Sequence, residues 1–271
     1  MNALEKIISK NEDNKFICVG LDTDINKIPS VIKNEKDAVH FFNKKIIEAT
    51  KDSVAAYKIN FAFYEVLGPY GFELIEKTLQ EIPSEIFVIA DSKRGDISNT
   101  SEMYAKSVFE YFNFDAVTVN PFMGFDSIEP FLKYENKLTF LLGLTSNQGA
   151  NDFQKLEIKS GEKLFQYIIK KSIEWNYKFK NCGLVFGATN LEELKENIKA
   201  FDTLPILLPG VGSQGGSFDD VVKLFKSFHR KNFLINLSRS IIYKDQSLNF
   251  DVAARLEIIK LNNIANQIFS D

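Results

Sequence analysis

The sequence of 271 residues contains two cysteines and two histidines, and this scarcity limits the chemistry open to it. Cys18 and Cys182 both lie inside apolar, strand-like stretches, which favours core thiols in a reducing compartment over a disulfide or a catalytic pair. Neither cysteine has a neighbour at metal-ligand spacing, so we expect no metal site. His40 and His229 fall in helical patterns away from every predicted strand end, and we give them no catalytic role.

Long apolar runs and an excess of basic charge are also missing. No run approaches the roughly 20 apolar residues of a membrane span. Residues 1–10 predict a short amphipathic helix without the apolar core or cleavage site of a signal peptide. The formal net charge of −3 does not indicate nucleic acid or an anionic membrane as a partner. We therefore expect a cytoplasmic protein with a small-molecule ligand.

What the sequence does contain is a series of short apolar segments bounded by turn residues. Continuous apolar runs of this length are typical of a parallel sheet that is buried on both faces. These segments lie at residues 16–20, 54–59, 86–91, 115–119, 138–144, 182–186, 205–209 and 233–237.

Helical patterns separate the apolar segments. They occupy residues 35–51, 71–79, 99–112, 191–201, 218–228 and 252–269. Asn99 with Glu102, and Thr189 with Glu192, have the spacing of a capping box. Segment 148–175 is longer than one crossover helix requires, and we expect an extra turn or a mobile loop there.

The alternation of strands and helices, without a linker or a break in composition, predicts an α/β fold. We expect one (β/α)8 barrel, a TIM barrel, formed as a single domain by residues 1–271. A doubly wound open sheet is the alternative. It is weakened because no Gly-x-Gly-x-x-Gly follows the first strand.

The run Asp91-Ser92-Lys93-Arg94-Gly95-Asp96 directly follows the third apolar segment. Charge gathered near a core costs free energy unless it is paired, so we do not expect this run to serve packing. Asp91 and Lys93 are two residues apart and leave the same face of an extended backbone. A solvated loop with a helix cap is the alternative for this run taken alone.

Other polar residues occur at the predicted strand ends, where a barrel of this kind carries its active site. Each has a structural explanation when taken alone, but their concentration at one end of the barrel favours a shared site. They include Asp22, Lys58, Asn120, Ser146 and Arg239.

The loops after the last two strands are the customary phosphate site of this barrel. Gly212 and Gly215, within the glycine-rich segment 209–216, let backbone N–H groups approach an anion closely. Gln214 adds a side-chain donor, and Arg239 can bind a phosphate in bidentate fashion. The sequence therefore predicts a small phosphorylated substrate.

Lys58, Asp91, Lys93 and Asp96 would then face the reacting end of that ligand. Their alternating charges compensate one another, so they can be held desolvated and preorganised. A fixed carboxylate would repel a substrate carboxylate, while a neighbouring ammonium would favour a carbanion and could donate a proton to it. A decarboxylation without metal or cofactor needs this arrangement.

Taken together, these motifs are similar to those of a known family. Residues 91–100 resemble the signature of orotidine 5′-phosphate decarboxylase. The pieces at 120–124 and 145–147 are similar to the bacterial branch called type 2. The resemblance covers almost the whole chain in order, at residues 19–22, 57–58, 91–100, 120–124, 145–147, 208–216 and 238–239.

The resemblance implies a cofactor-free conversion of orotidine 5′-monophosphate to UMP in pyrimidine biosynthesis. It makes Lys93 the proton donor to C6 of the pyrimidine and places Asp91 beside the departing carboxylate. Lys58 and Asp22 would position the ribose hydroxyls and complete the charge network. Thr23 departs from the family, which often has proline after the first-strand aspartate.

The resemblance also implies a homodimer, because Asp96 would reach into the active site of the partner subunit, with Thr100 nearby. Ser146 matches the serine that hydrogen-bonds the pyrimidine ring. Gln214 and Arg239 match the phosphate grip.

Three alternatives stay open. The first is another decarboxylase or aldolase of the same barrel superfamily, which would act on a sugar phosphate with magnesium. The second is a Schiff-base aldolase that uses Lys58 or Lys93. The third is a barrel that binds a nucleotide without turnover.

Overall fold

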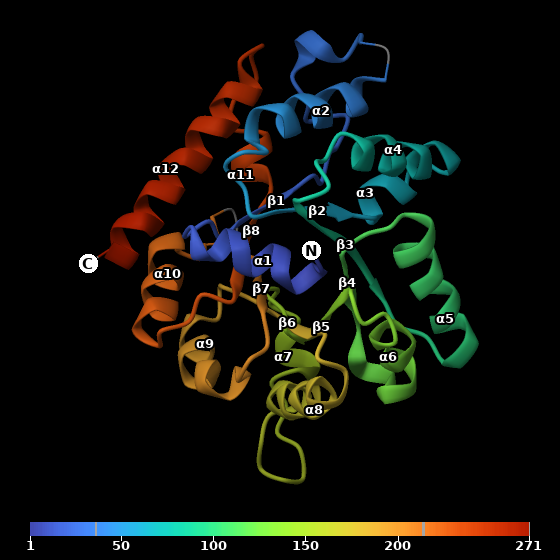
Figure 1. Cartoon of the computed structure of the whole chain (residues 1–271), viewed down its shortest axis with the longest axis vertical. Helices are drawn as coiled ribbons and strands as arrows, with labels where there is room; N and C mark the ends of the chain where they lie inside the picture. The colour runs from blue at the N-terminus through green and yellow to red at the C-terminus, as the bar shows by residue number, and fades with distance from the viewer. Residues whose placement is uncertain (36, 213–214, 271) are drawn as a thin grey trace.

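The computed structural model describes residues 1–35, 37–212 and 215–270, and these residues form a closed barrel of eight parallel strands in chain order (Figure 1). The prediction of a (β/α)8 barrel is confirmed, and the open-sheet alternative is wrong. The strands are β1 (Ile17–Gly20), β2 (Ala56–Asn60), β3 (Phe87–Arg94), β4 (Ala116–Val119), β5 (Leu138–Leu144), β6 (Cys182–Phe186), β7 (Ile206–Leu208) and β8 (Phe233–Leu237).

Helices surround the barrel. They are α1 (Ala3–Glu12), α2 (Ala38–Thr50), α3 (Ala62–Glu65), α4 (Pro69–Gln80), α5 (Ser98–Lys106), α6 (Phe125–Leu132), α7 (Ala150–Phe153), α8 (Leu164–Phe179), α9 (Leu191–Asn197), α10 (Phe218–Ser227), α11 (Arg239–Ile242) and α12 (Phe250–Ser270). Tighter turns form η1 (Ser30–Ile32), η3 (Pro121–Met123) and η4 (Ile198–Phe201), and the π-helical turn η2 (Ser107–Tyr111) continues α5. Segment 148–175 contains the predicted extra turn as α7.

The strands are buried on both faces, which explains their continuous apolar sequences. Inside the barrel, large rings such as Phe87 and Phe140 pack beside small residues such as Ala116. Cys18 belongs to this inner cluster, whereas Cys182 belongs to the layer between strands and helices. Both cysteines are free and buried, as the sequence predicts. Among the described residues, no helix is long and apolar enough to cross a membrane.

The two predicted capping boxes are wrong. Ile97 precedes α5 and Asn190 precedes α9, and neither side chain caps its helix. Ser98, the first residue of α5, has a φ of 45°, so the path of the chain out of β3 places the helix start one residue before Asn99. A capping box is found at α1 instead, where Asn2 and Glu5 exchange backbone-to-side-chain hydrogen bonds of 2.8 and 2.9 Å.

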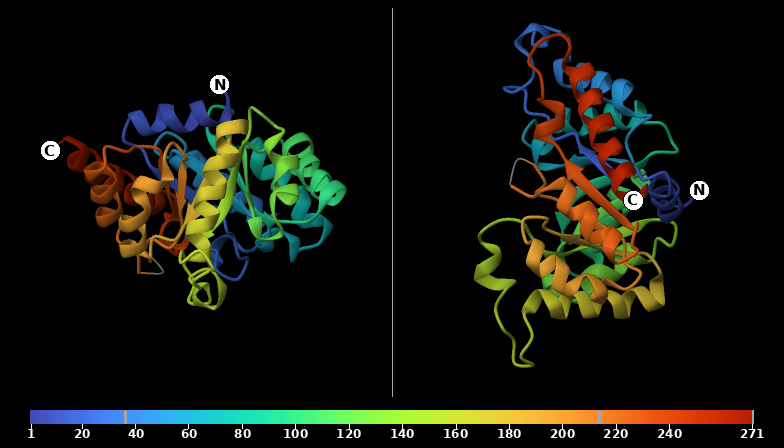
Figure 2. Two further views of the ribbon diagram at one scale, coloured as in Figure 1. Left: turned by 90° about the horizontal axis from the view of Figure 1, so that it is seen from below. Right: turned by 90° about the vertical axis from the view of Figure 1, so that its left-hand side faces the viewer.

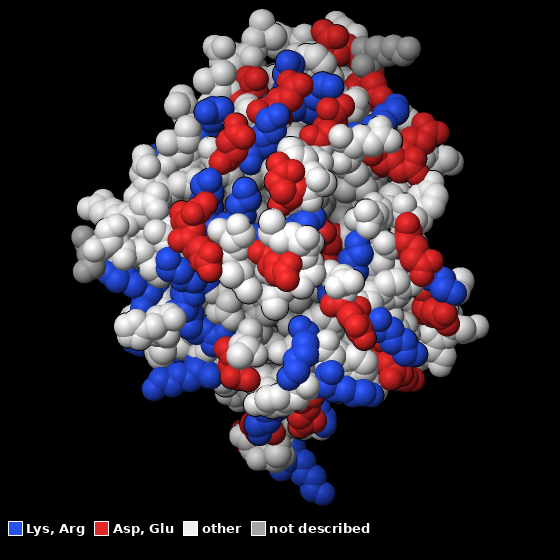
Figure 3. Space-filling model, in the orientation of Figure 1, with Lys and Arg blue, Asp and Glu red and all other residues white. Residues whose placement is uncertain are grey.

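Helix α1 closes the amino end of the barrel. The Lys6 ammonium lies 2.8 Å from the Asp115 carboxylate just before β4, and the Asn11 amide donates to the carbonyls of Lys231 and Phe233 beside β8. In Figure 1 this helix lies in front of the strands, and Figure 2 shows α7 on the opposite side of the molecule. The carboxyl ends of the strands therefore open on the side away from α1. The face that carries α1, seen in Figure 3, has acidic and basic side chains interspersed.

Replacement of Asn11 by alanine should weaken this closure. The buried Asn11 amide serves two carbonyls, and leaving such groups unpaired costs about 1–3 kcal/mol. We expect the free energy of unfolding in urea to fall by about this amount. Glu12→Ala, an exposed change on the same helix, is the matched control and should leave it unchanged. Equal stability of the two variants would contradict the assigned role of Asn11.

Candidate active site

A chain of alternating charges lies at the carboxyl ends of β1, β2 and β3. Lys58 of β2 is buried, and its Nζ lies 2.8 Å from Asp91 Oδ2 and 3.4 Å from Asp22 Oδ1. Lys93 Nζ lies 2.7 Å from the other oxygen of Asp91, Oδ1. The four residues Asp22, Lys58, Asp91 and Lys93 thus form one connected array, which we call the charge array.

The surrounding charges keep Lys58 and Asp91 ionised. Burial alone would raise the pKa of Asp91, but the ammonium groups of Lys58 and Lys93 outweigh it and hold the pKa below its ordinary value. Burial would likewise lower the pKa of Lys58, whereas Asp22 and Asp91 raise it above the ordinary value. Asp91 is therefore a carboxylate, and Lys58 an ammonium, throughout the neutral pH range.

Lys93 occupies an unusual backbone position. Its φ of 48° lies in the left-handed region, which is uncommon for a residue with a side chain. Half of its side chain, 50%, is exposed, compared with 5% for Lys58. The Lys93 ammonium is thus fixed to Asp91 and still accessible from the open end of the barrel.

Asp96 and Thr100 lie outside the charge array. Asp96 is partly buried, and its carboxylate accepts a hydrogen bond of 2.8 Å from the backbone N–H of Ile97. Across residues 1–35, 37–212 and 215–270, Asp96 forms no ion pair. Thr100 is exposed on the first turn of α5. Within the described part of the chain, no hydrogen bond or ion pair joins either residue to the charge array.

The loop after β5 carries Ser146 and is held from two sides. Gln154 follows α7 and accepts a hydrogen bond of 2.7 Å from the backbone N–H of Thr145. On the other side, a Cβ atom added to Gly187 would lie 2.7 Å from the Ser146 backbone, so only glycine permits this approach. Gln154 of the extra segment and Gly187 after β6 therefore confine the loop that carries Ser146.

The loops after β7 and β8 meet each other. Gly212 and Gly215 have φ values of 77° and 97°, which favour glycine, and the Gly215 N–H donates to the Gly212 carbonyl at 3.0 Å. A Cβ atom on Gly212 would lie 3.3 Å from Ser240 Oγ, which places Gly212 against α11. Arg239 is exposed at the start of α11, and Gln214 lies outside the described residues.

Asn120 lies between β4 and η3 and is the N-cap residue of η3. Its backbone N–H donates to the Arg94 carbonyl at 2.8 Å, and its side-chain oxygen accepts from the Phe122 N–H at 3.1 Å. The side-chain oxygen thus caps a turn, so a contact with a ligand would use the amide nitrogen.

Sequence reasoning missed a buried polar network behind Asp22. Thr23 donates to Asn43 at 2.6 Å, Asn43 donates to the Tyr64 hydroxyl at 2.9 Å, and Tyr64 donates to the Leu21 carbonyl at 2.8 Å. These bonds connect α2 and α3 to the residues on both sides of Asp22, through the Thr23 hydroxyl and the Leu21 carbonyl. The signal in the sequence was Thr23, which stands where the family often has proline.

Sequence reasoning also missed Thr118 of β4. Its hydroxyl lies 2.9 Å from Asp91 Oδ1 and accepts a hydrogen bond of 3.1 Å from the Lys93 backbone N–H. A lone threonine in an apolar strand gives no signal of such a contact, because threonine is common in strands for its β-branched shape.

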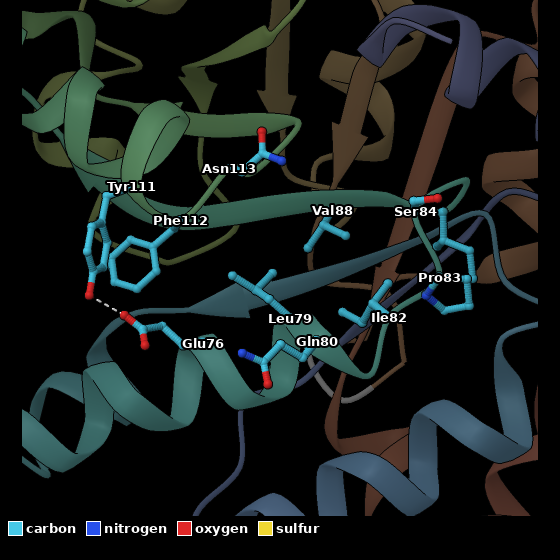
Figure 4. A pocket seen from close by; sticks show the side chains of 11 residues that line it. Glu76, Leu79, Gln80, Ile82, Pro83, Ser84, Val88, Tyr111, Phe112 and Asn113 are labelled. Carbon is cyan, nitrogen blue, oxygen red and sulfur yellow. Dashed lines mark hydrogen bonds between the residues drawn. The ribbon is translucent and has the colours of Figure 1, made fainter.

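Neither a metal centre nor the cavity beside β3 offers comparable chemistry among the described residues. Across the part of the chain that the structure describes, no three His, Cys, Asp or Glu residues are grouped to hold a metal ion. A cavity of about 440 Å³ lies between α4 and η2, beside the start of β3 (Figure 4). Its acidic residue, Glu76, accepts a hydrogen bond from Tyr111, and neither lysine nor arginine lines this cavity.

Charged residues held at the carboxyl end of a closed parallel barrel are typical of a (β/α)8-barrel enzyme. Comparison with known proteins identifies the family within this class. The chain belongs to the orotidine 5′-phosphate decarboxylase / HUMPS family, whose model matches residues 15–249. These residues include every candidate site residue.

Relatives with the decarboxylase name cover nearly the full chain. Orotidine 5′-phosphate decarboxylase of Christiangramia forsetii is 46% identical over 271 residues, which are 98% of this chain and 96% of that protein. The structure of Leishmania donovani OMP decarboxylase, at 31% identity, has a TM-score of 0.83 and covers 98% of this chain and 100% of its own. This chain also spans 57% of Leishmania donovani UMP synthase, at 32% identity and a TM-score of 0.84. Proteins named orotidine 5′-phosphate decarboxylase are carboxy-lyases.

The lowered pKa of Asp91 predicts how stability responds to acid. A carboxyl group with a depressed pKa in the folded state contributes stability above its unfolded pKa of about 3.9, and loses that contribution as the pH falls toward the folded value. We expect the difference in unfolding free energy between wild type and Asp91→Asn to be constant above about pH 5. Below about pH 4 the wild type should lose stability relative to Asp91→Asn.

Urea unfolding at a series of pH values measures this difference. Asp126→Asn, which removes an exposed carboxylate on α6, controls for the loss of one negative charge. Curves for wild type and Asp91→Asn that stay parallel to about pH 3 would contradict the ionised state of Asp91.

Proposed function

We propose that this chain catalyses the cofactor-free decarboxylation of orotidine 5′-monophosphate to UMP in pyrimidine biosynthesis. The observation that carries the proposal is the charge array, in which a buried Lys58 and an accessible Lys93 flank the ionised Asp91. The family and the names of the relatives support the choice of substrate. The family description also includes HUMPS, so the family model alone does not choose the substrate. The names of the relatives therefore give the stronger support for orotidine 5′-monophosphate.

In the proposed reaction the bond between C6 and the carboxylate breaks, CO₂ leaves, and the electron pair stays on C6. Asp91, fixed beside the substrate carboxylate, destabilises it by repulsion that disappears as CO₂ departs. The Lys93 ammonium stabilises the growing negative charge and then transfers a proton from Nζ to C6. Lys58 holds Asp91 in place, Asp22 in turn pairs with Lys58, and Lys58 and Asp22 bind the ribose hydroxyls.

One lysine does not account for the whole rate. A carbanion without an electron sink requires a barrier reduction near the top of the enzymatic range, roughly 20 kcal/mol or more. Binding energy from the distant phosphate contributes by closing the site and expelling water. We assign this phosphate to Gly212, Gly215 and Arg239 together with Gln214. Ser146 would bind the pyrimidine, and Asn120 is a further candidate contact.

We also propose that the working form is a homodimer in which Asp96 and Thr100 complete the partner's site. Asp96 lies outside the charge array of its own chain, which fits a role in the other subunit. Ile97 and Met103, beside these residues, are exposed apolar side chains of the kind that an interface would bury. The free, buried cysteines fit a cytoplasmic location.

The decisive experiment follows the loss of orotidine 5′-monophosphate absorbance with purified protein in buffer that contains EDTA. Rapid formation of UMP supports the proposal and its independence of metal. Activity on a sugar phosphate that magnesium restores and EDTA abolishes would favour the rival barrel enzyme. Trapping of a carbonyl substrate by borohydride would favour a Schiff-base aldolase.

Arg239→Ala tests the phosphate assignment. We expect kcat/KM to fall about 10- to 100-fold, since hydrogen bonds to charged groups contribute about 1.5–3 kcal/mol each. Steady-state kinetics with Arg255→Ala as the control measure the effect, because Arg255 lies on α12 and its guanidinium donates to the Ala49 carbonyl of α2. Near-wild-type affinity and turnover in Arg239→Ala would refute the phosphate grip.

Mixed dimers test the shared site. Lys93→Ala and Asp96→Ala should each be nearly inactive, but a dimer of one copy of each contains one site with both residues intact. Random exchange makes half of the dimers mixed, so about a quarter of wild-type turnover should return on mixing. If activity does not return although mass spectrometry shows mixed dimers, Asp96 does not act across the interface.

A further inference from the structure

We infer that Thr118 is a positioning residue that sets where the Lys93 ammonium stands relative to Asp91. The inference builds on the proposed function, because it concerns the lysine assigned to proton transfer. It rests on the backbone of β3, on the two hydrogen bonds of the Thr118 hydroxyl, and on a comparison with a second buried threonine.

The backbone of β3 departs from its neighbour at this point. Ile89 and Ala90 pair in register with Ala116 and Val117 of β4, but the next pair is Arg94 with Val119. Four residues of β3 therefore span the same distance as two residues of β4. The extra length is taken up between Ala90 and Arg94, where Lys93 adopts its left-handed φ of 48°.

The Thr118 hydroxyl replaces the missing ladder hydrogen bond. The Lys93 N–H donates to Thr118 Oγ1 at 3.1 Å. The same hydroxyl donates to Asp91 Oδ1 at 2.9 Å, the oxygen that also receives the Lys93 ammonium at 2.7 Å. One hydroxyl thus fixes the main chain of Lys93 and the carboxylate that holds its side chain. A hydroxyl has one donor and two acceptor positions, so it can make both bonds at once.

The position of the hydroxyl is well defined. Thr118 is 1% exposed, and its β-branched side chain has restricted χ1 rotation. Thr139 of β5 offers a natural comparison, because it is equally buried and lies on the adjacent strand. Its hydroxyl has no hydrogen-bond partner among the residues that the structure describes. Burial of a threonine in this barrel therefore does not by itself account for the contacts of Thr118.

Without the hydroxyl, the Lys93 N–H loses its acceptor and the left-handed turn loses its support. The ammonium would then leave the position from which it meets C6, and proton transfer and carbanion stabilisation would weaken. The loops after β7 and β8 would be untouched, since Thr118 makes its contacts with β3. The expected signature is a loss of turnover without a loss of nucleotide binding.

The test uses three variants of the full chain: Thr118→Val, Thr118→Ser and Thr139→Val. We expect Thr118→Val to lower kcat about 100-fold, as misplacement of a reacting group by about 1 Å does in other enzymes. The dissociation constant for UMP, measured by calorimetry, should stay unchanged. Thr118→Ser, which keeps the hydroxyl, should recover most of the turnover, and Thr139→Val should match the wild type.

Three results would overturn the inference. They are wild-type kcat in folded Thr118→Val, a loss confined to UMP affinity or thermal stability, and an equal loss of kcat in Thr139→Val. A crystal structure of Thr118→Val adds a readout that does not depend on the reaction. We expect Lys93 to leave the left-handed region or its Nζ to move away from Asp91. An unchanged conformation of Asp91 and Lys93 would be a fourth result that overturns the inference. Failure of the proposed function is recognised separately, because the wild type itself would then form no UMP.

Discussion

The buried ion pair between Lys58 and Asp91 is the interaction on which the rest of the site depends. An ammonium group at the centre of a barrel is tolerated only when opposite charge compensates for its lost hydration. Asp91 of β3 and Asp22, just beyond the end of β1, supply that charge. Once Asp91 is fixed in this way, its second oxygen is available to orient Lys93. The geometry at the reacting end of the site thus starts from an electrostatic requirement of the barrel interior.

Much of this arrangement follows from sequence because it is local or repeats along the chain. Strands buried on both faces give continuous apolar runs, and parallel topology brings their polar end residues together, so Asp22, Lys58, Asp91 and Lys93 could be placed at one site. The contacts of Thr118 could not be predicted, since they depend on a register shift between β3 and β4. The network of Thr23, Asn43 and Tyr64 joins distant segments, and the role of Asp96 depends on a second subunit.

The helix starts show a related limit of local patterns. Asn99 and Glu102 have suitable spacing for a capping box, yet α5 begins at Ser98. The chain enters that helix from the charged loop, where both Lys93 and Ser98 have positive φ values. A left-handed residue with a side chain costs roughly 1–2 kcal/mol. Tertiary contacts such as those of Thr118 and Asp91 therefore decide the path, and the local preference of Asn99 for a cap is overridden.

The closure of the amino end by α1 separates two demands on the sequence. Contacts such as Lys6 with Asp115 hold the barrel together at one end, while the charge array occupies the other. Sequence drift at the closed end can change the melting temperature without moving a catalytic atom, so substitutions there can accumulate or be repaired independently of activity. Substitutions meant to raise the thermal stability can therefore be placed at the α1 end of the barrel without altering the active site.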